Sequence, residues 1–147
     1  MIAVHPNPSP FLHVDARHKV ATVTLIAGYN GENNGFNFDG YGRGELLVSI
    51  PRGWRIRITC TNRSAQPNSC AVVKGPMNDT PAFRGASVPN AVDGLASGQT
   101  VRFSFVASRI GGYRLASLVP GHEEARQWDV LEVTKGGKPS ISARAGP

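Results

Sequence analysis

The sequence predicts an all-β fold, either a β-sandwich or a Greek-key barrel. Apolar residues recur at every second position in several short runs, and glycine, proline, asparagine or serine bounds each run. No long stretch has the periodicity of a helix. Because successive side chains of a strand point to opposite faces, such runs bury one face and leave the other in water. Seven strands separated by turns are typical of two packed sheets.

The predicted strands follow one another along the chain. They are the runs 19–28, 44–50, 54–62, 70–75, 100–108, 112–119 and 128–133. In the third run Ile56 and Ile58 alternate with Arg57, as a half-buried strand requires. The segment from Gly75 to Gly98 is different, because it is long and rich in proline, glycine and asparagine. It is expected to hold at most a helical turn or two.

The length of 147 residues suits one hydrophobic core, so a single domain is expected over residues 18–134. Residues 1–17 are predicted to form an extended, proline-rich arm, since the prolines of HPNPSP remove backbone donors and fix an extended path. Residues 135–147 are rich in glycine, serine and proline, which predicts a flexible tail.

The chain is basic, with 16 Lys and Arg residues against 10 acidic ones and a formal charge of +6. The basic residues are scattered singly, so a nucleic-acid partner is not expected. No run of eighteen apolar residues is present, and no membrane span is expected. The start lacks the features of a signal peptide, which favours a cytoplasmic protein if Met1 is the native start.

Several blocks of the sequence carry a family resemblance. They are VTLIAG, GFNFDGYGRGELLVSIPRGW, TNRSAQPNSCAVV, SVPNAVDGLASGQTVRFSF and GGYRLASLVPGHEEARQWDVLEV, in this order between Val20 and Val133. Together they resemble sulfocyanin, a blue-copper protein of the cupredoxin superfamily. The resemblance implies a cupredoxin-like Greek-key sandwich with a Pro/Gly-rich excursion between strands. It also implies an extracytoplasmic location (periplasmic, cell-surface or secreted) and a protein partner such as a membrane electron-transfer or surface assembly.

The resemblance also assigns the positions of the copper ligands. The first histidine of the family follows a proline and falls at Asn68. The cysteine, second histidine and methionine are five residues apart and fall at Ser117, His122 and Gln127. A blue-copper site needs two imidazoles and a thiolate, whereas a serine hydroxyl stays protonated near neutral pH. These four positions are therefore expected to be vestigial, with no metal and no other cofactor.

The sequence thus predicts a copper-free, non-enzymatic cupredoxin-like domain that serves as a protein-binding or structural module. An alternative is an electron-transfer or copper-handling protein with a non-blue metal site around His122. Asn68, Gln127 or the N-terminal histidines would assist such a site; these are His5, His13 and His18. A third hypothesis is a hydrolase, in which Ser117 is the nucleophile, His122 the base and Asp129 or Glu123 the orienting acid.

Two further expectations concern buried groups. Cys60 and Cys70 are predicted to point into the core, where they form either one disulfide or two buried thiols. In the absence of copper, Asn68, Ser117 and His122 are expected to share a direct or water-bridged hydrogen-bond network, because buried polar groups need partners.

Overall fold

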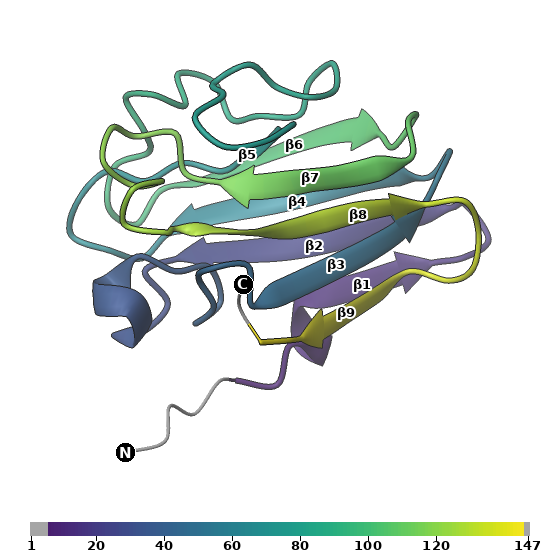
Figure 1. Cartoon of the computed structure of the whole chain (residues 1–147), viewed down its shortest axis with the longest axis horizontal. Helices are drawn as coiled ribbons and strands as arrows, with labels where there is room; N and C mark the ends of the chain where they lie inside the picture. Colours follow the sequence, from purple (N-terminus) through teal and green to yellow (C-terminus); the bar gives the residue numbers. More distant parts are fainter. Residues whose placement is uncertain (1–5, 146–147) are drawn as a thin grey trace.

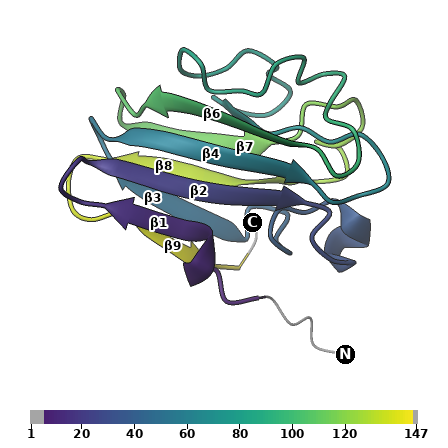
Figure 2. The ribbon, with the colours of Figure 1, turned by 180° about the vertical axis from the view of Figure 1, so that it is seen from behind.

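Two β-sheets pack face to face in the computed structural model, which describes residues 6–145 (Figures 1 and 2). The first sheet has the order β1 (Leu12–Asp15), β2 (Val20–Ala27), β4 (Arg55–Asn62) and β6 (Thr100–Val106). The second has the order β5 (Ala71–Val73), β7 (Gly111–Ala116), β8 (Trp128–Thr134), β3 (Leu46–Pro51) and β9 (Ser140–Ala143). Two 3-10 helices, η1 (Ser9–Phe11) and η2 (Glu32–Gly35), precede β1 and β3. The predicted all-β sandwich is confirmed, and all seven predicted strands are present.

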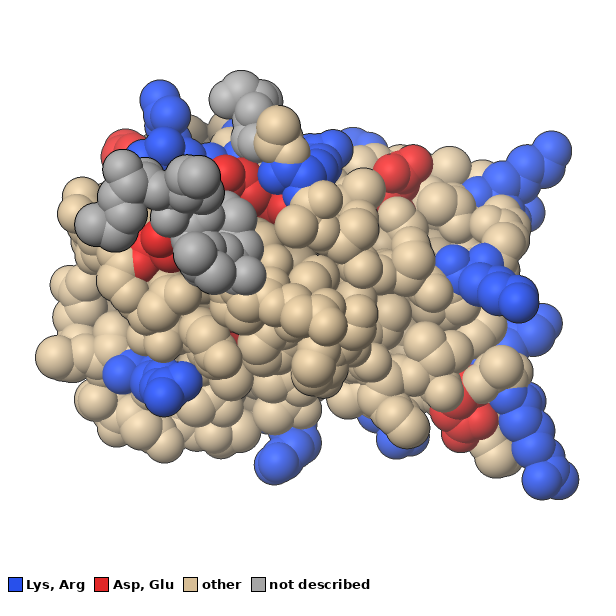
Figure 3. Space-filling model, turned by 90° about the horizontal axis from the view of Figure 1, so that it is seen from below, with Lys and Arg blue, Asp and Glu red and all other residues tan. Residues whose placement is uncertain are grey.

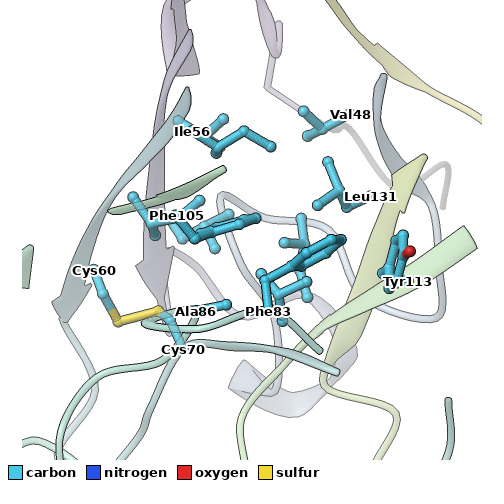
Figure 4. Close-up of a cluster of buried hydrophobic side chains, with 14 of the residues drawn as sticks. Val48, Ile56, Cys60, Cys70, Phe83, Ala86, Phe105, Tyr113 and Leu131 are labelled. Atoms are coloured by element: carbon cyan, nitrogen blue, oxygen red, sulfur yellow. A yellow bond between two sulfur atoms is a disulfide. The ribbon is translucent and has the colours of Figure 1, made fainter. Parts of the chain in front are cut away.

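The core lies between the sheets and follows from the alternation seen in the sequence. Ile56 and Ile58 of β4 are buried, whereas Arg57 between them is exposed. Val48 of β3 and Leu131 of β8 face them from the second sheet (Figure 4). Apolar burial of this kind supplies the main stabilisation of a sandwich.

The Pro/Gly-rich excursion closes one side of the core. Its residues 75–98 are all described, and none of them lies in a helix. Phe83 from this segment stacks 5.3 Å from Phe105 of β6 and lies 4.7 Å from Tyr113 of β7, measured between ring centroids (Figure 4). The excursion is therefore anchored to both sheets by aromatic packing.

The strand directions separate the connections into two ends of the sandwich. Strand β2 is parallel to β4, and β3 is parallel to β8. As a result the turns β1–β2, β3–β4, β6–β7 and β8–β9 lie at one end, which we call the turn end (right in Figure 1). The connections 28–45, 63–70 and 117–127 lie at the opposite, loop end. The predicted ligand positions all belong to the loop end or to strands that reach it.

Two terminal segments differ from the prediction. The predicted arm contributes β1, whose His13 is paired with Thr22 of β2, and the predicted flexible tail contributes β9, paired with β3. Both strands are four residues long and lie at sheet edges, where few apolar side chains are needed and the sequence pattern is weak. Among the described residues, no helix has the length and apolar character that crossing a bilayer would need.

Candidate functional site

The predicted ligand loop, residues 117–127, joins β7 to β8 and is closed by its own backbone. Ser117 N–H donates to Gln127 O at 3.4 Å, and Gln127 N–H donates to His122 O at 3.0 Å. Gly121 has φ of +90°, a conformation that a side chain disfavours. The Pro-Gly-His sequence therefore forms a tight turn that directs His122 inward, where its side chain is only 5% exposed.

Ser117 and His122 are in direct contact inside this loop. Ser117 Oγ lies 2.8 Å from His122 Nδ1, and Ser117 is fully buried. Ser117 Oγ also accepts a hydrogen bond from the backbone N–H of Ser69. Its own hydroxyl proton is therefore available to donate to an unprotonated His122 Nδ1. The contact joins the two positions that the resemblance assigns to the cysteine and the second histidine.

Ser69 ties this pair to the other side of the site. Its backbone N–H donates to Ser117 Oγ at 3.1 Å, and its side-chain Oγ accepts from Leu118 N–H at 2.9 Å. Ser69 is fully buried. The sequence-based prediction did not include Ser69. Its place between the predicted ligand position Asn68 and the apolar run that begins at Cys70 was a usable signal.

Asn68 does not join the predicted network by a direct bond. Its Nδ2 instead donates to Ser64 Oγ at 2.7 Å and to Asn62 Oδ1 at 3.3 Å. Both partners are close to Asn68 in the sequence: Asn62 ends β4, and Ser64 lies in the connection between β4 and β5. Of the expected network, the structure has the direct Ser117–His122 contact, and Ser69 rather than Asn68 makes the direct connection to Ser117; a water-bridged link from Asn68 stays a prediction.

Gln127 is fully buried and is held by the 28–45 connection. Its Nε2 donates to Asn37 O at 3.2 Å, while its Oε1 has no hydrogen-bond partner. The Oδ1 atom of Asn68 is buried and unpartnered in the same way. Two of the four predicted ligand positions thus carry buried oxygen atoms without partners.

His122 is buried and packs against an aromatic ring. The ring of Phe36 packs edge-on against the imidazole, with 5.3 Å between the ring centroids. Burial lowers the pKa of His122, an effect that the nearby amide of Gln127 and the charge of Glu124 partly oppose. The neutral imidazole is therefore favoured, which suits an Nδ1 atom that accepts the Ser117 proton.

These side chains do not match the donors of a blue-copper site. Such a site requires two imidazoles and a thiolate, whereas the residues present are one imidazole, one hydroxyl and two amides. Within residues 6–145, no group of three or more His, Cys, Asp or Glu side chains is placed to hold a metal ion. The Nδ1 atom of His122 is already engaged by Ser117.

The two N-terminal histidines that the structure describes do not complete the site. His13 lies on β1, and His18 lies in the turn end, where its Nδ1 contacts Asp15 Oδ2 at 2.8 Å. The turn end is opposite the ligand loop, so His18 and His122 are separated by the length of the sandwich. His5 lies outside the described residues.

The arrangement also lacks the third member of a hydrolytic triad. Asp129 Oδ1 accepts from Leu46 N–H at 3.1 Å, and Glu123 Oε2 accepts from Met77 N–H at 2.7 Å. Neither carboxylate orients His122, so both predicted orienting acids were wrong. A hollow of about 310 Å³ opens beside the loop and is bordered by Asp79, Glu123 and Glu124, but Ser117 beneath it is fully buried.

Cys60 of β4 and Cys70, just before β5, form a disulfide, with their Cα atoms 6.0 Å apart (Figure 4). Of the two alternatives left open by the sequence, the structure has the bonded one. The bond connects the first sheet to the segment that carries Asn68 and Ser69, and so fixes one wall of the site.

Comparison with known proteins identifies the family. Residues 9–137 match the model of the Sulfocyanin (SoxE) domain. A curated sulfocyanin from Sulfolobus acidocaldarius is 24% identical over 126 residues, which are 78% of this chain; the chain spans 63% of that relative.

Solved structures show the same fold. Auracyanin from Roseiflexus castenholzii has a TM-score of 0.54 at 20% identity, covering 77% of this chain and 96% of its own. Auracyanin A from Chloroflexus aurantiacus, described as a blue copper protein, has a TM-score of 0.53 at 22% identity, covering 78% and 99%. With a cupredoxin fold and a family match over most of its length, this chain belongs to the sulfocyanin family.

Proposed function

We propose that this chain is a copper-free member of its family and acts as a protein-binding or structural module. The observation that carries the proposal is the hydrogen bond between Ser117 Oγ and His122 Nδ1. It joins two ligand positions directly and engages one of the two ring nitrogens through which an imidazole binds a metal. A serine hydroxyl also cannot supply the thiolate bond on which blue-copper electron transfer depends.

The polar groups of the loop end support a structural role for the former ligands. Ser117 accepts from Ser69, and Ser69 accepts from Leu118, so the segments on both sides of the site are joined without a metal. Buried hydrogen bonds of this kind contribute about 1 kcal/mol each. The loop is thus held closed by side chains that replace the function of a bridging ion.

The experiment that tests this proposal restores the missing donors. Asn68→His and Ser117→Cys are introduced singly and together, with His122 and Gln127 unchanged, and each protein is loaded with Cu(II). The double variant is expected to show the intense visible absorption of a copper–thiolate bond, whereas wild type and Asn68→His stay colourless. Colour in wild type would contradict the proposal. A colourless double variant that folds normally would refute the idea that the metal was lost through these two substitutions.

A second candidate is a copper-handling protein with a non-blue site. It is favoured by the unpartnered buried oxygens of Asn68 and Gln127, which lie at two ligand positions. A calorimetric Cu(II) titration separates the candidates. Tight one-to-one binding that His122→Ala abolishes, and that His13→Ala with His18→Ala leaves intact, would favour the second candidate.

We further infer that the protein works outside the cytoplasm. The Cys60–Cys70 disulfide supports this location, because cytoplasmic thiols are normally kept reduced. Thiol titration of protein isolated from its native cells under alkylating conditions tests it; two free thiols would argue for a reducing compartment.

A further inference from the structure

The fold gathers basic residues that are scattered along the sequence. The four turns of the turn end, the outward face of the first sheet and the adjoining end of β8 together carry nine Lys and Arg side chains and two carboxylates. We call this surface the basic face; its cations are Arg17, Lys19, Arg52, Arg55, Arg57, Arg102, Arg109, Lys135 and Lys138, and its carboxylates are Asp15 and Glu132. The basic face thus has a formal charge of +7, although the whole chain has only +6. Figure 3 shows Lys and Arg side chains projecting from the turn end, on the right.

The topology explains this concentration. Arg55 N–H donates to Lys19 O at 3.0 Å, and Arg52 N–H donates to Thr134 O at 2.8 Å, so backbone bonds join three of the four turns. On the sheet, Arg57 pairs with Ser104 and Thr59 pairs with Arg102. Cations far apart in sequence therefore lie on a continuous and rigid surface.

Seven of these nine cations have no side-chain hydrogen bond or ion pair among residues 6–145. Arg55 donates to Ser104 Oγ, and Arg109 is bound to Ala82 O. The side chains of the other seven form no hydrogen bond or ion pair with described residues. Of the two carboxylates, Asp15 is already engaged by His18. Unpaired charges of one sign on one surface attract an anionic partner and orient it as it approaches.

A hollow in the first sheet supplies a specific anchor. It has a volume of about 410 Å³ and lies between Arg57 and Arg102, with the hydroxyls of Thr22, Thr59 and Ser104 around it. The two arginines occupy diagonal positions of adjacent strands, which places their Cα atoms roughly 7 Å apart. Carboxylates at alternate positions of an extended peptide have nearly the same spacing, about 7 Å.

We propose that the basic face docks an acidic segment of a protein partner, with two carboxylates bound by Arg57 and Arg102. Six of the nine cations are arginines, which bind carboxylates through two parallel hydrogen bonds and are enriched in protein interfaces, whereas lysine is depleted there. This composition favours a protein over a lipid surface. The inference rests on the proposed binding role, gives it a surface and a partner chemistry, and does not depend on the copper content.

The test uses a fluorescein-labelled decaglutamate peptide and fluorescence anisotropy, with chelator present so that copper does not affect the result. Arg57→Gln with Arg102→Gln is compared with Arg43→Gln with Arg126→Gln, which removes the same charge from the loop end. The first double variant is expected to weaken binding by about tenfold, and the control to stay within about twofold of wild type. Both proteins should unfold near the wild-type temperature, because all four side chains are exposed and only Arg43 of the four forms a side-chain hydrogen bond with a described residue, to Asn33 Oδ1 at 3.2 Å.

Three outcomes would overturn the inference. The peptide could show no saturable binding, or both double variants could lose affinity equally. The third is that an oligothymidylate of equal charge, or phosphatidylserine vesicles, bind more tightly than the peptide does. If the peptide fails to bind while wild type remains free of copper, the basic face is refuted and the copper-free assignment stands. Retention of copper by wild type would refute the copper-free assignment and would not affect the proposal for the basic face.

Discussion

Ser117 Oγ and His122 Nδ1 lie 2.8 Å apart, and neither side chain is more than 5% exposed. The serine hydroxyl connects two groups, because it also accepts from the backbone N–H of Ser69. Its position five residues before the histidine is the ligand spacing that the sulfocyanin resemblance implies.

Ser117→Ala is predicted to destabilise the protein by about 1–3 kcal/mol. The substitution leaves both Ser69 N–H and His122 Nδ1 buried without their partner. Urea unfolding measures the change as a lower midpoint at unchanged slope. Ser97→Ala, at an exposed serine, is the control and should be neutral. A Ser117→Ala protein as stable as wild type would show that the contact has no structural value.

Stability is predicted to fall as pH rises, because of two buried aspartates. Burial raises the pKa of Asp39 and of Asp129 well above the usual value of 3.8. Asp39 Oδ1 accepts from Ile26 N–H and Asp129 Oδ1 from Leu46 N–H, while the Oδ2 atom of each is buried with no hydrogen-bond partner among the described residues. The folded protein therefore binds these protons more strongly than the unfolded chain. Their contribution is complete below pH 3.8 and is lost as pH rises toward the raised values.

Asp129→Asn removes one of these titrations. The unfolding free energy of the variant minus that of wild type should increase with pH above about 4, by up to roughly 1.4 kcal/mol per pH unit, because only wild type loses this contribution. Urea unfolding from pH 3 to pH 8 measures it, with Asp93→Asn at an exposed site as the control. A difference that does not change with pH would mean that Asp129 is ionised in the folded protein over this range.

The disulfide is predicted to stabilise the protein by about 2–4 kcal/mol. Cys60 and Cys70 are 10 residues apart, so the bond limits a short loop of the unfolded chain. Replacing both by alanine should lower the urea midpoint by a corresponding amount and leave the far-ultraviolet circular dichroism unchanged. Equal midpoints for the oxidised protein and the variant would contradict this contribution.

The sequence was sufficient for the strands that pack against the core. In β4 the alternation of Ile56 and Ile58 with Arg57 specifies both the strand and its buried face. It was insufficient for β1 and β9, because edge strands of four residues bury little and alternate over only two apolar positions each.

Only part of the site was predicted from the sequence. The family resemblance implied the positions of Ser117 and His122, and also that the two side chains lie within hydrogen-bond reach, as they do. The direction of the Asn68 amide depends on the fold of its own segment, which brings Ser64 Oγ within 2.7 Å. The basic face was not visible in the sequence because strand pairing, rather than chain proximity, brings Lys19 next to Arg55.

Copper retention by the wild-type protein tests the central claim most directly. Purified protein is incubated with excess Cu(II), passed through a chelating column and analysed for metal per chain, with its visible spectrum recorded before and after. The Ser117–His122 contact predicts no retained copper and no intense visible band. One copper per chain that survives the chelator, with or without colour, would contradict the account.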